Sequence, residues 1–169
     1  MDDDFKSFHV GVSAEAFTAG LFARCGLDIS VQYGANQPEY DLIVAKGDKL
    51  LKVSVKGSKD GSWGLTQSYI ENADYHGAVD QWLAKHKGKT IFCLVQFKNT
   101  EIGEMPRIYI ATPEEIGKRL KDSAKGRGET ILYEYHEWSS RAHAAGTIDK
   151  IPDSWKFSTR RLEELLKNA

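Results

Sequence analysis

The sequence predicts an α/β fold in three layers, in which helices flank a central mixed β-sheet. Three observations predict it: an apolar repeat of helical period near the N-terminus, a hairpin pattern over 38–56, and a run of strand-forming residues over 90–97. A chain of 169 residues has the length of one ordinary domain and can bury a sizeable core. We therefore expect a single domain over 1–169, with its core at about 8–135 and a C-terminal extension with a helix at about 136–169.

The first helix is predicted from apolar residues that recur every three or four positions before Gly26, namely Val10, Ala14, Phe17, Leu21 and Cys25. Glu15 lies on a stripe with small and apolar residues, so it borders the buried face of this helix. A half-buried glutamate needs a partner. Three interpretations of Glu15 are open: it forms a structural ion pair, it is exposed to solvent at the edge of the helix, or it belongs to a functional site.

A β-hairpin is predicted over Pro38 to Lys56, where two apolar runs are joined by a Gly47-Asp48 turn. With these two residues in the turn, Lys46 faces Lys49 and, further along, Asp41 faces Ser54. Since side chains alternate between the two faces of a sheet, Asp41, Ser54 and Lys56 are expected on the same side. An acid and a lysine would then converge at one end of the hairpin.

The remaining elements follow from apolar periodicity and from cap and turn residues. We expect strands at 27–33, 90–97, 107–111 and 130–135, helices at about 70–86, at 113–121 and after Ser158-Thr159, a flexible loop at 57–64 and an irregular segment at 136–155.

Composition narrows the function classes. The net charge of −1 provides no overall positive field, so any contact with nucleic acid must use local patches. Cys25 and Cys93 form no CxxC pair, which favours buried thiols in a reducing compartment, and the histidine spacings match no zinc motif. The sequence has no membrane-spanning run and no nucleotide-binding or serine-hydrolase signature, so we expect a cytoplasmic protein without those chemistries.

The placement of Asp41 and Lys56 resembles the PD-(D/E)XK nuclease superfamily, which has the restriction-endonuclease-like fold. In that family an Asp on one strand and an acid-X-Lys on the next bind a divalent metal beside the scissile phosphate. Asp41 matches the first motif and Lys56 matches the lysine, while Glu15 fits the glutamate that the family carries in the preceding helix. The chain departs from the family at Ser54, where an acid or a glutamine is usual, and a hydroxyl is a poor ligand for a hard metal.

The resemblance implies a metal-dependent nuclease that hydrolyses phosphodiester bonds, with DNA as the expected substrate. Glu15, Asp41 and the carbonyl of Val55 would hold Mg²⁺ or Mn²⁺, and Glu15, Asp41 and Lys56 would form the catalytic set. Lys56 would position or activate the attacking water and offset charge on the phosphoryl oxygens. Cleavage of both strands of a duplex would suit a symmetric homodimer.

The loop that follows Lys56 supplies candidate nucleic-acid contacts, since its hydroxyl, ammonium and indole groups suit a phosphate backbone. With Ser54, these candidates are Ser58, Lys59 and Trp63. A solvated turn is the other interpretation of this loop. Asp60 is a candidate substitute for the acid that is missing at Ser54.

Two alternatives to the nuclease hypothesis stay open. In the first, the loss of an acid at Ser54 leaves a degenerate nuclease fold that binds nucleic acid or a protein partner without cleaving. In the second, Asp41 caps a turn and Lys56 extends along the surface of a strand, with no chemistry at either residue.

Overall fold

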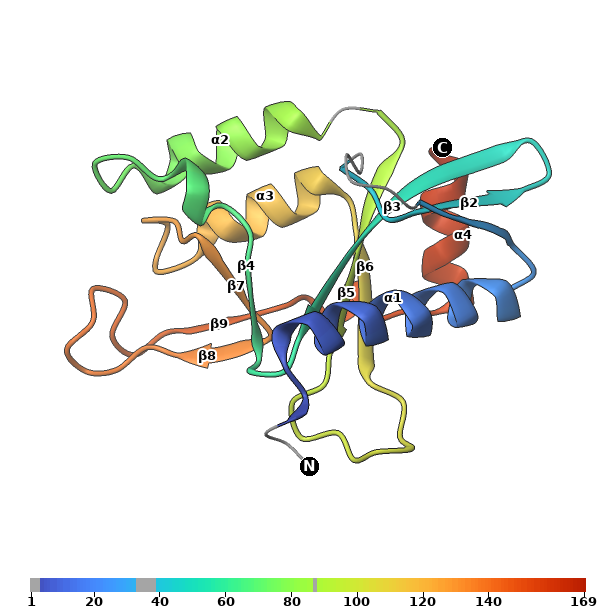
Figure 1. The fold of residues 1–169 in the computed structure, drawn as a ribbon. Coiled ribbons are helices and arrows are strands. Elements are labelled where there is room, and N and C mark those ends of the chain that lie inside the picture. Colours follow the sequence, from blue (N-terminus) through green and yellow to red (C-terminus); the bar gives the residue numbers. More distant parts are fainter. Residues whose placement is uncertain (1–3, 33–38, 87) are drawn as a thin grey trace. The chain divides into compact units, whose positions relative to one another are not determined.

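A computed structural model describes residues 4–32, 39–86 and 88–169 of the chain. The chain forms two compact units, and each is assembled from segments that are separate in the sequence (Figure 1). The first unit comprises the described residues of 1–60, 88–112 and 154–169, and the second comprises those of 61–87 and 113–153. The expectation of one domain over 1–169 stays a prediction.

The first unit is built on a five-stranded mixed sheet. Its strands, in spatial order, are β1 (Asp28–Val31), β2 (Leu42–Lys46), β3 (Lys49–Ser58), β5 (Thr90–Gln96) and β6 (Arg107–Ala111). Neighbouring strands are antiparallel except β3 and β5, which run parallel. All seven residues of β5 are buried, so the side chains on both faces of this strand are covered, as the apolar run predicted.

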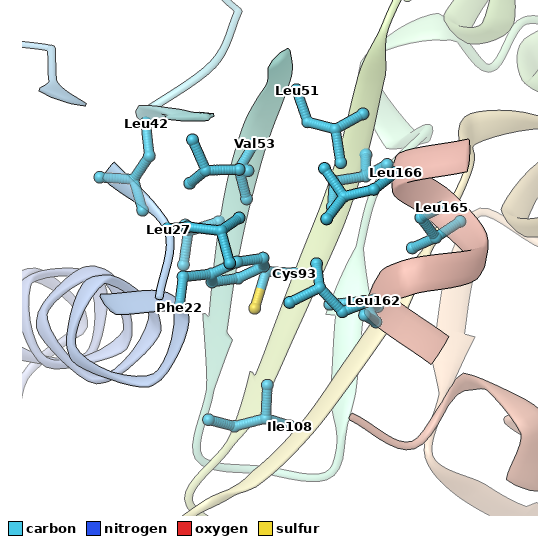
Figure 2. Close-up of a cluster of buried hydrophobic side chains, with 14 of the residues drawn as sticks. Phe22, Leu27, Leu42, Leu51, Val53, Cys93, Ile108, Leu162, Leu165 and Leu166 are labelled. Atoms are coloured by element: carbon cyan, nitrogen blue, oxygen red, sulfur yellow. The ribbon is translucent and has the colours of Figure 1, made fainter. Parts of the chain in front are cut away.

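Helices α1 (Ser7–Arg24) and α4 (Thr159–Lys167) cover one face of this sheet and bury its apolar side chains (Figure 2). Phe22 of α1 and Leu162 of α4 meet Leu42, Val53 and Cys93 from three strands in one cluster. The predicted α/β class, with helices flanking a central mixed sheet, is confirmed. The predicted C-terminal helix is also confirmed, and its Leu162, Leu165 and Leu166 pack into the core of the first unit.

The hairpin is confirmed, and so is its turn. Lys46 pairs with Lys49, Val44 with Leu51, and regular pairing continues to Leu42 and Val53. Gly47 has φ 62°, a left-handed conformation that glycine adopts readily in a two-residue turn. The side chains of Val44, Leu51 and Val53 are buried in the cluster beneath α1 and α4, so the alternation gave the correct faces.

The second unit holds two helices and two small antiparallel sheets. Its elements are α2 (Tyr75–Lys85), α3 (Pro113–Asp122), β4 (Ser62–Gly64) paired with β7 (Ile131–Tyr133), and β8 (Tyr135–Glu137) paired with β9 (Ile148–Lys150). A short 3₁₀ helix lies at Gln67–Tyr69, and another, Asp153–Trp155, begins at the last residue of this unit. The two helices pack closely at Gly117, where an added Cβ would lie 2.8 Å from a methyl of Leu83.

Several predicted boundaries were wrong in this second unit. The helix expected from residue 70 begins at Tyr75, because Asn72 and Ala73 adopt left-handed φ angles and Asp74 caps the helix by accepting the N–H of Gly77 at 2.9 Å. The strand expected over 130–135 is two short strands, and the irregular segment contains β9. The expected loop at 57–64 is largely β3 and β4, so only Lys59 to Gly61 lie outside strands.

Two further observations bear on the expectations from composition. Cys25 and Cys93 are both free thiols, and Cys93 is fully buried, with its Sγ 3.3 Å from the Thr18 hydroxyl. Burial raises the pKa of the Cys93 thiol to about 12. No helix in the described part of the chain is long and apolar enough to span a membrane.

Candidate functional site

The candidate site lies where strand β3 extends beyond strand β2. β3 has ten residues and β2 has five, so β2 pairs only with the segment from Lys49 to Val53. On its other side β3 pairs with β5 from Lys52 to Ser58. The edge of β3 that follows Val53 on the β2 side is therefore left for another group.

Asp41 fills this edge with its side chain. Its Oδ2 accepts the backbone N–H of Val55 at 2.6 Å, while its own N–H donates to the Val53 carbonyl at 2.9 Å. The expected pairing of Asp41 with Ser54 is thus replaced, because Asp41 forms a bend just before β2 and its carboxylate acts as the strand partner. The N–H and C=O of a strand residue point the same way, so the Val55 carbonyl also faces this edge.

Glu15 approaches the same edge from helix α1. Its helical turn packs against β3 at Gly57, where an added Cβ would lie 2.9 Å from the Ala14 side chain. The pKa of the half-buried Glu15 carboxyl is raised, first by burial and then by the negative charge of Asp41, while the positive charge of Lys56 lowers it. Asp41 and Lys56 therefore both lie close enough to Glu15 for their charges to act on its carboxyl.

Lys56 and Ser54 lie on the face of β3 that is opposite the core, since Val53 and Val55 point into the cluster beneath α1 and α4. Their environments differ. The Lys56 side chain is exposed, whereas Ser54 is only 2% exposed. Lys56 can thus reach a bound molecule, while the Ser54 hydroxyl has almost no accessible surface.

The residues at the site fit a metal that takes few protein ligands. Glu15 and Asp41 offer two hard carboxylates, and the described residues contain no group of three or more His, Cys, Asp or Glu side chains placed to hold an ion. Mg²⁺ keeps several of its waters and needs only one or two carboxylates beside a substrate phosphate. Asp60, the candidate substitute for Ser54, has its carboxylate bound to the Ser58 hydroxyl at 2.9 Å.

The candidate nucleic-acid contacts differ in exposure. Ser54, Ser58 and Trp63 are 2%, 6% and 3% exposed, so their side chains offer little surface to a polymer. Trp63 belongs to the second unit, where it pairs with Leu132. Lys59 is exposed, and its Nζ donates to the Phe5 carbonyl at 2.5 Å. Of these four candidates, only Lys59 has an exposed side chain.

Sequence reasoning missed one contact beside the site. The Lys52 ammonium lies over the ring of Tyr40, 5.1 Å from its centroid, and Tyr40 directly precedes Asp41. Alternation along the strand had already placed Lys52 on the same face as Ser54 and Lys56. The contact between Lys52 and Tyr40 could not be predicted from the sequence, because it depends on the bend at Asp41.

The fold is similar to that of a nuclease. No protein-family model matches the chain, and no curated protein sequence matches it. The solved structure of a bacterial homing endonuclease aligns with 96% of this chain and 95% of that one, with a TM-score of 0.52 and 12% sequence identity. At this identity the likeness establishes the fold alone, so the chain has a fold that a nuclease also uses.

Proposed function

We propose that the protein is a metal-dependent nuclease of the PD-(D/E)XK type, with Glu15, Asp41 and Lys56 at its active site. The observation that carries the proposal is the Asp41 carboxylate held at the β3 edge, with its charge and that of Lys56 both acting on Glu15, because two carboxylates and a lysine are what this chemistry requires. The homing-endonuclease fold supports it. Nucleic acid is then the substrate, and DNA is the one we expect.

Glu15, Asp41 and the Val55 carbonyl would hold Mg²⁺ or Mn²⁺, since the Asp41 carboxylate binds the Val55 backbone at the β3 edge and the charge of Asp41 acts on Glu15. When bound, such an ion lowers the pKa of a coordinated water and offsets negative charge on the phosphoryl oxygens. Burial is the main cause of the raised pKa of Glu15 and the negative charge of Asp41 adds to it, so a bound cation would offset both effects. Such a site favours a cation.

Lys56 contributes positive charge where negative charge accumulates during phosphodiester hydrolysis. Its ammonium has three donors and no acceptor, so it can bind a non-bridging phosphate oxygen and orient the attacking water. Because Lys56 is exposed on the face of β3 that points away from the core, a substrate can reach it without rearrangement of the strand. The strand holds it in register, since β5 pairs with β3 through Ser58.

A second candidate function follows from Ser54. This residue stands where the family carries an acid or glutamine, and its hydroxyl is a poor ligand for a hard metal. A site with one ligand fewer could retain nucleic-acid binding and lose cleavage. We therefore keep a binding protein of nuclease fold as the alternative.

The test is a cleavage assay with labelled DNA and RNA, each single-stranded and duplex, in Mg²⁺ and in Mn²⁺. Cleavage by wild type that Asp41→Asn abolishes would support the nuclease, and we expect faster cleavage in Mn²⁺. If neither wild type nor Ser54→Glu cleaves while nucleic-acid affinity is retained, the nuclease proposal is discarded in favour of the binding protein.

A further inference from the structure

We infer that Lys52 is a second phosphate-binding residue, which holds the nucleic-acid strand at a phosphate away from the one that Lys56 serves. This inference rests on the proposed function and extends it to how the substrate is positioned. Lys52 lies on β3, the middle strand of the five-stranded sheet in the first unit.

The backbone of Lys52 is fixed on both sides. Lys52 pairs with Ile43 of β2 and with Thr90 of β5, and its N–H donates to the Lys89 carbonyl at 2.8 Å. A residue with a strand on each side cannot shift without breaking two ladders. The backbone position of Lys52 is therefore fixed by both neighbouring strands.

Lys52 and Lys56 project from the same face of β3, since they are four residues apart on one strand. At a rise of about 3.3 Å per residue, their Cα atoms are separated by about 13 Å. A nucleic-acid strand carries a phosphate about every 3.4 Å along the duplex axis, so a strand running beside β3 offers both ammonium groups a phosphate. Ser54 lies between them and is only 2% exposed, so the nucleic acid would contact the two ammonium groups and not the surface of β3 between them.

Tyr40 orients the Lys52 side chain. The ammonium lies 5.1 Å from the ring centroid, a cation–π contact, and Tyr40 is the neighbour of the proposed metal ligand Asp41. An aromatic face does not neutralise a charge as a carboxylate would, so the ammonium keeps its charge and its donors for an anion. The contact thus places a positive charge beside the candidate site before substrate binds.

The experiment measures binding of the full chain to a labelled DNA oligonucleotide, single-stranded and duplex, without divalent metal and across a salt series. We expect Lys52→Ala to lower affinity about tenfold and to reduce the slope of log affinity against log salt by about 1, as the loss of one phosphate contact does. The matched control is Lys49→Ala, which removes the same charge from the opposite face of the same strand. It should leave the slope unchanged.

Two further variants separate this positioning role from general charge. Tyr40→Phe keeps the aromatic face and should bind as wild type does, whereas Tyr40→Leu should lower affinity in the direction of Lys52→Ala. At saturating DNA with metal, Lys52→Ala should keep its turnover within about threefold of wild type, because only Lys56 acts on the scissile phosphate. The effect of Lys52→Ala should therefore fall on KM and not on kcat.

An unchanged salt slope in Lys52→Ala, or an equal drop in Lys49→Ala, would overturn the inference even if wild type cleaves DNA. Conversely, a slope that depends on Lys52 in a protein that never cleaves with Mg²⁺ or Mn²⁺ would support the inference and refute the nuclease. Circular dichroism of each variant should match wild type, since both lysines are solvent-facing for part of their length.

Discussion

The carboxylate of Asp41 accepts the backbone N–H of Val55 at 2.6 Å and so serves as the missing strand partner of β3. One residue therefore has two tasks, because the same carboxylate stabilises the sheet edge and raises the pKa of Glu15 nearby. These tasks can be separated by substitution, and the first prediction does so.

Asp41→Ala should lower the free energy of unfolding by about 1–3 kcal/mol, because the Val55 N–H loses its acceptor. Asp41→Asn is the matched control, since the amide oxygen can still accept that bond while the negative charge is gone. Both variants should lose metal binding, measured by calorimetry, but only Asp41→Ala should lose stability in urea. Equal stabilities of the two variants would show that the bond to Val55 contributes little.

Glu15→Gln should stabilise the metal-free protein at pH 7. A carboxyl whose pKa is higher in the folded than in the unfolded state contributes stability below the unfolded value, near 4.5, and loses that contribution as the pH rises through the folded value. Ionised Glu15 therefore opposes folding at pH 7, and the advantage of Gln should vanish toward pH 4. Thermal unfolding at the two pH values measures this, with exposed Glu163→Gln as control.

An excess of Mg²⁺ should make wild type more stable than Glu15→Gln at pH 7, because the ion stabilises the folded state only where both carboxylates remain. Wild type should then unfold at a higher temperature than Glu15→Gln. If Mg²⁺ shifted the two proteins equally, Glu15 would not be a ligand.

Lys56→Ala should lower turnover about 100-fold or more, which is the usual effect of losing one hydrogen-bond donor to the negative charge that develops in the transition state. Metal binding at pH 8 should stay largely intact. Because Lys56 lowers the pKa of Glu15, its removal should raise that pKa further and weaken metal binding as the pH falls toward 5. Calorimetric titrations at both pH values, with Lys56→Arg as control for charge, measure this. A pH-independent metal affinity in Lys56→Ala would contradict the coupling.

Ser54→Glu should destabilise the metal-free protein by about 2–4 kcal/mol, because the new carboxylate is placed at a position that is 2% exposed. Mn²⁺ should restore much of this loss and raise the cleavage rate if a missing ligand limits the site. Ser54→Ala, which removes the hydroxyl and adds no charge, serves as control. A loss of stability that metal does not restore would indicate that the Ser54 side chain does not reach the site.

Much of the site-bearing half of the fold could be predicted from the sequence, because it rests on local patterns. The Gly47 turn and the alternation around it set the hairpin register through Leu42 and Val53, and the helical repeat gave α1 and the half-buried position of Glu15. The C-terminal helix was predicted from its Ser158 cap, whose hydroxyl accepts the N–H of Arg161 at 3.0 Å. Each of these features is determined within a few residues.

The rest depends on contacts that are distant in sequence. The bend at Asp41 arises because β3 extends past β2. The residues near Asp41 do not indicate in the sequence where β2 ends relative to β3. Trp63 pairs with Leu132, about seventy residues away in the sequence. Because the sequence does not indicate so distant a pairing, its glycines predicted a flexible loop at 57–64. The burial of Ser54 was equally unpredictable, since alternation gives the face of a residue and not what covers it.

The central claim is that Glu15 and Asp41 hold one divalent ion beside Lys56, and anomalous diffraction from crystals grown with Mn²⁺ tests it most directly. We predict a single strong peak about 2.2 Å from a carboxylate oxygen of each acid, with the Val55 carbonyl in its coordination sphere. The Lys56 ammonium should lie nearby without coordinating the ion. A Mn²⁺ peak elsewhere on the chain, or none at saturating Mn²⁺, would contradict the account.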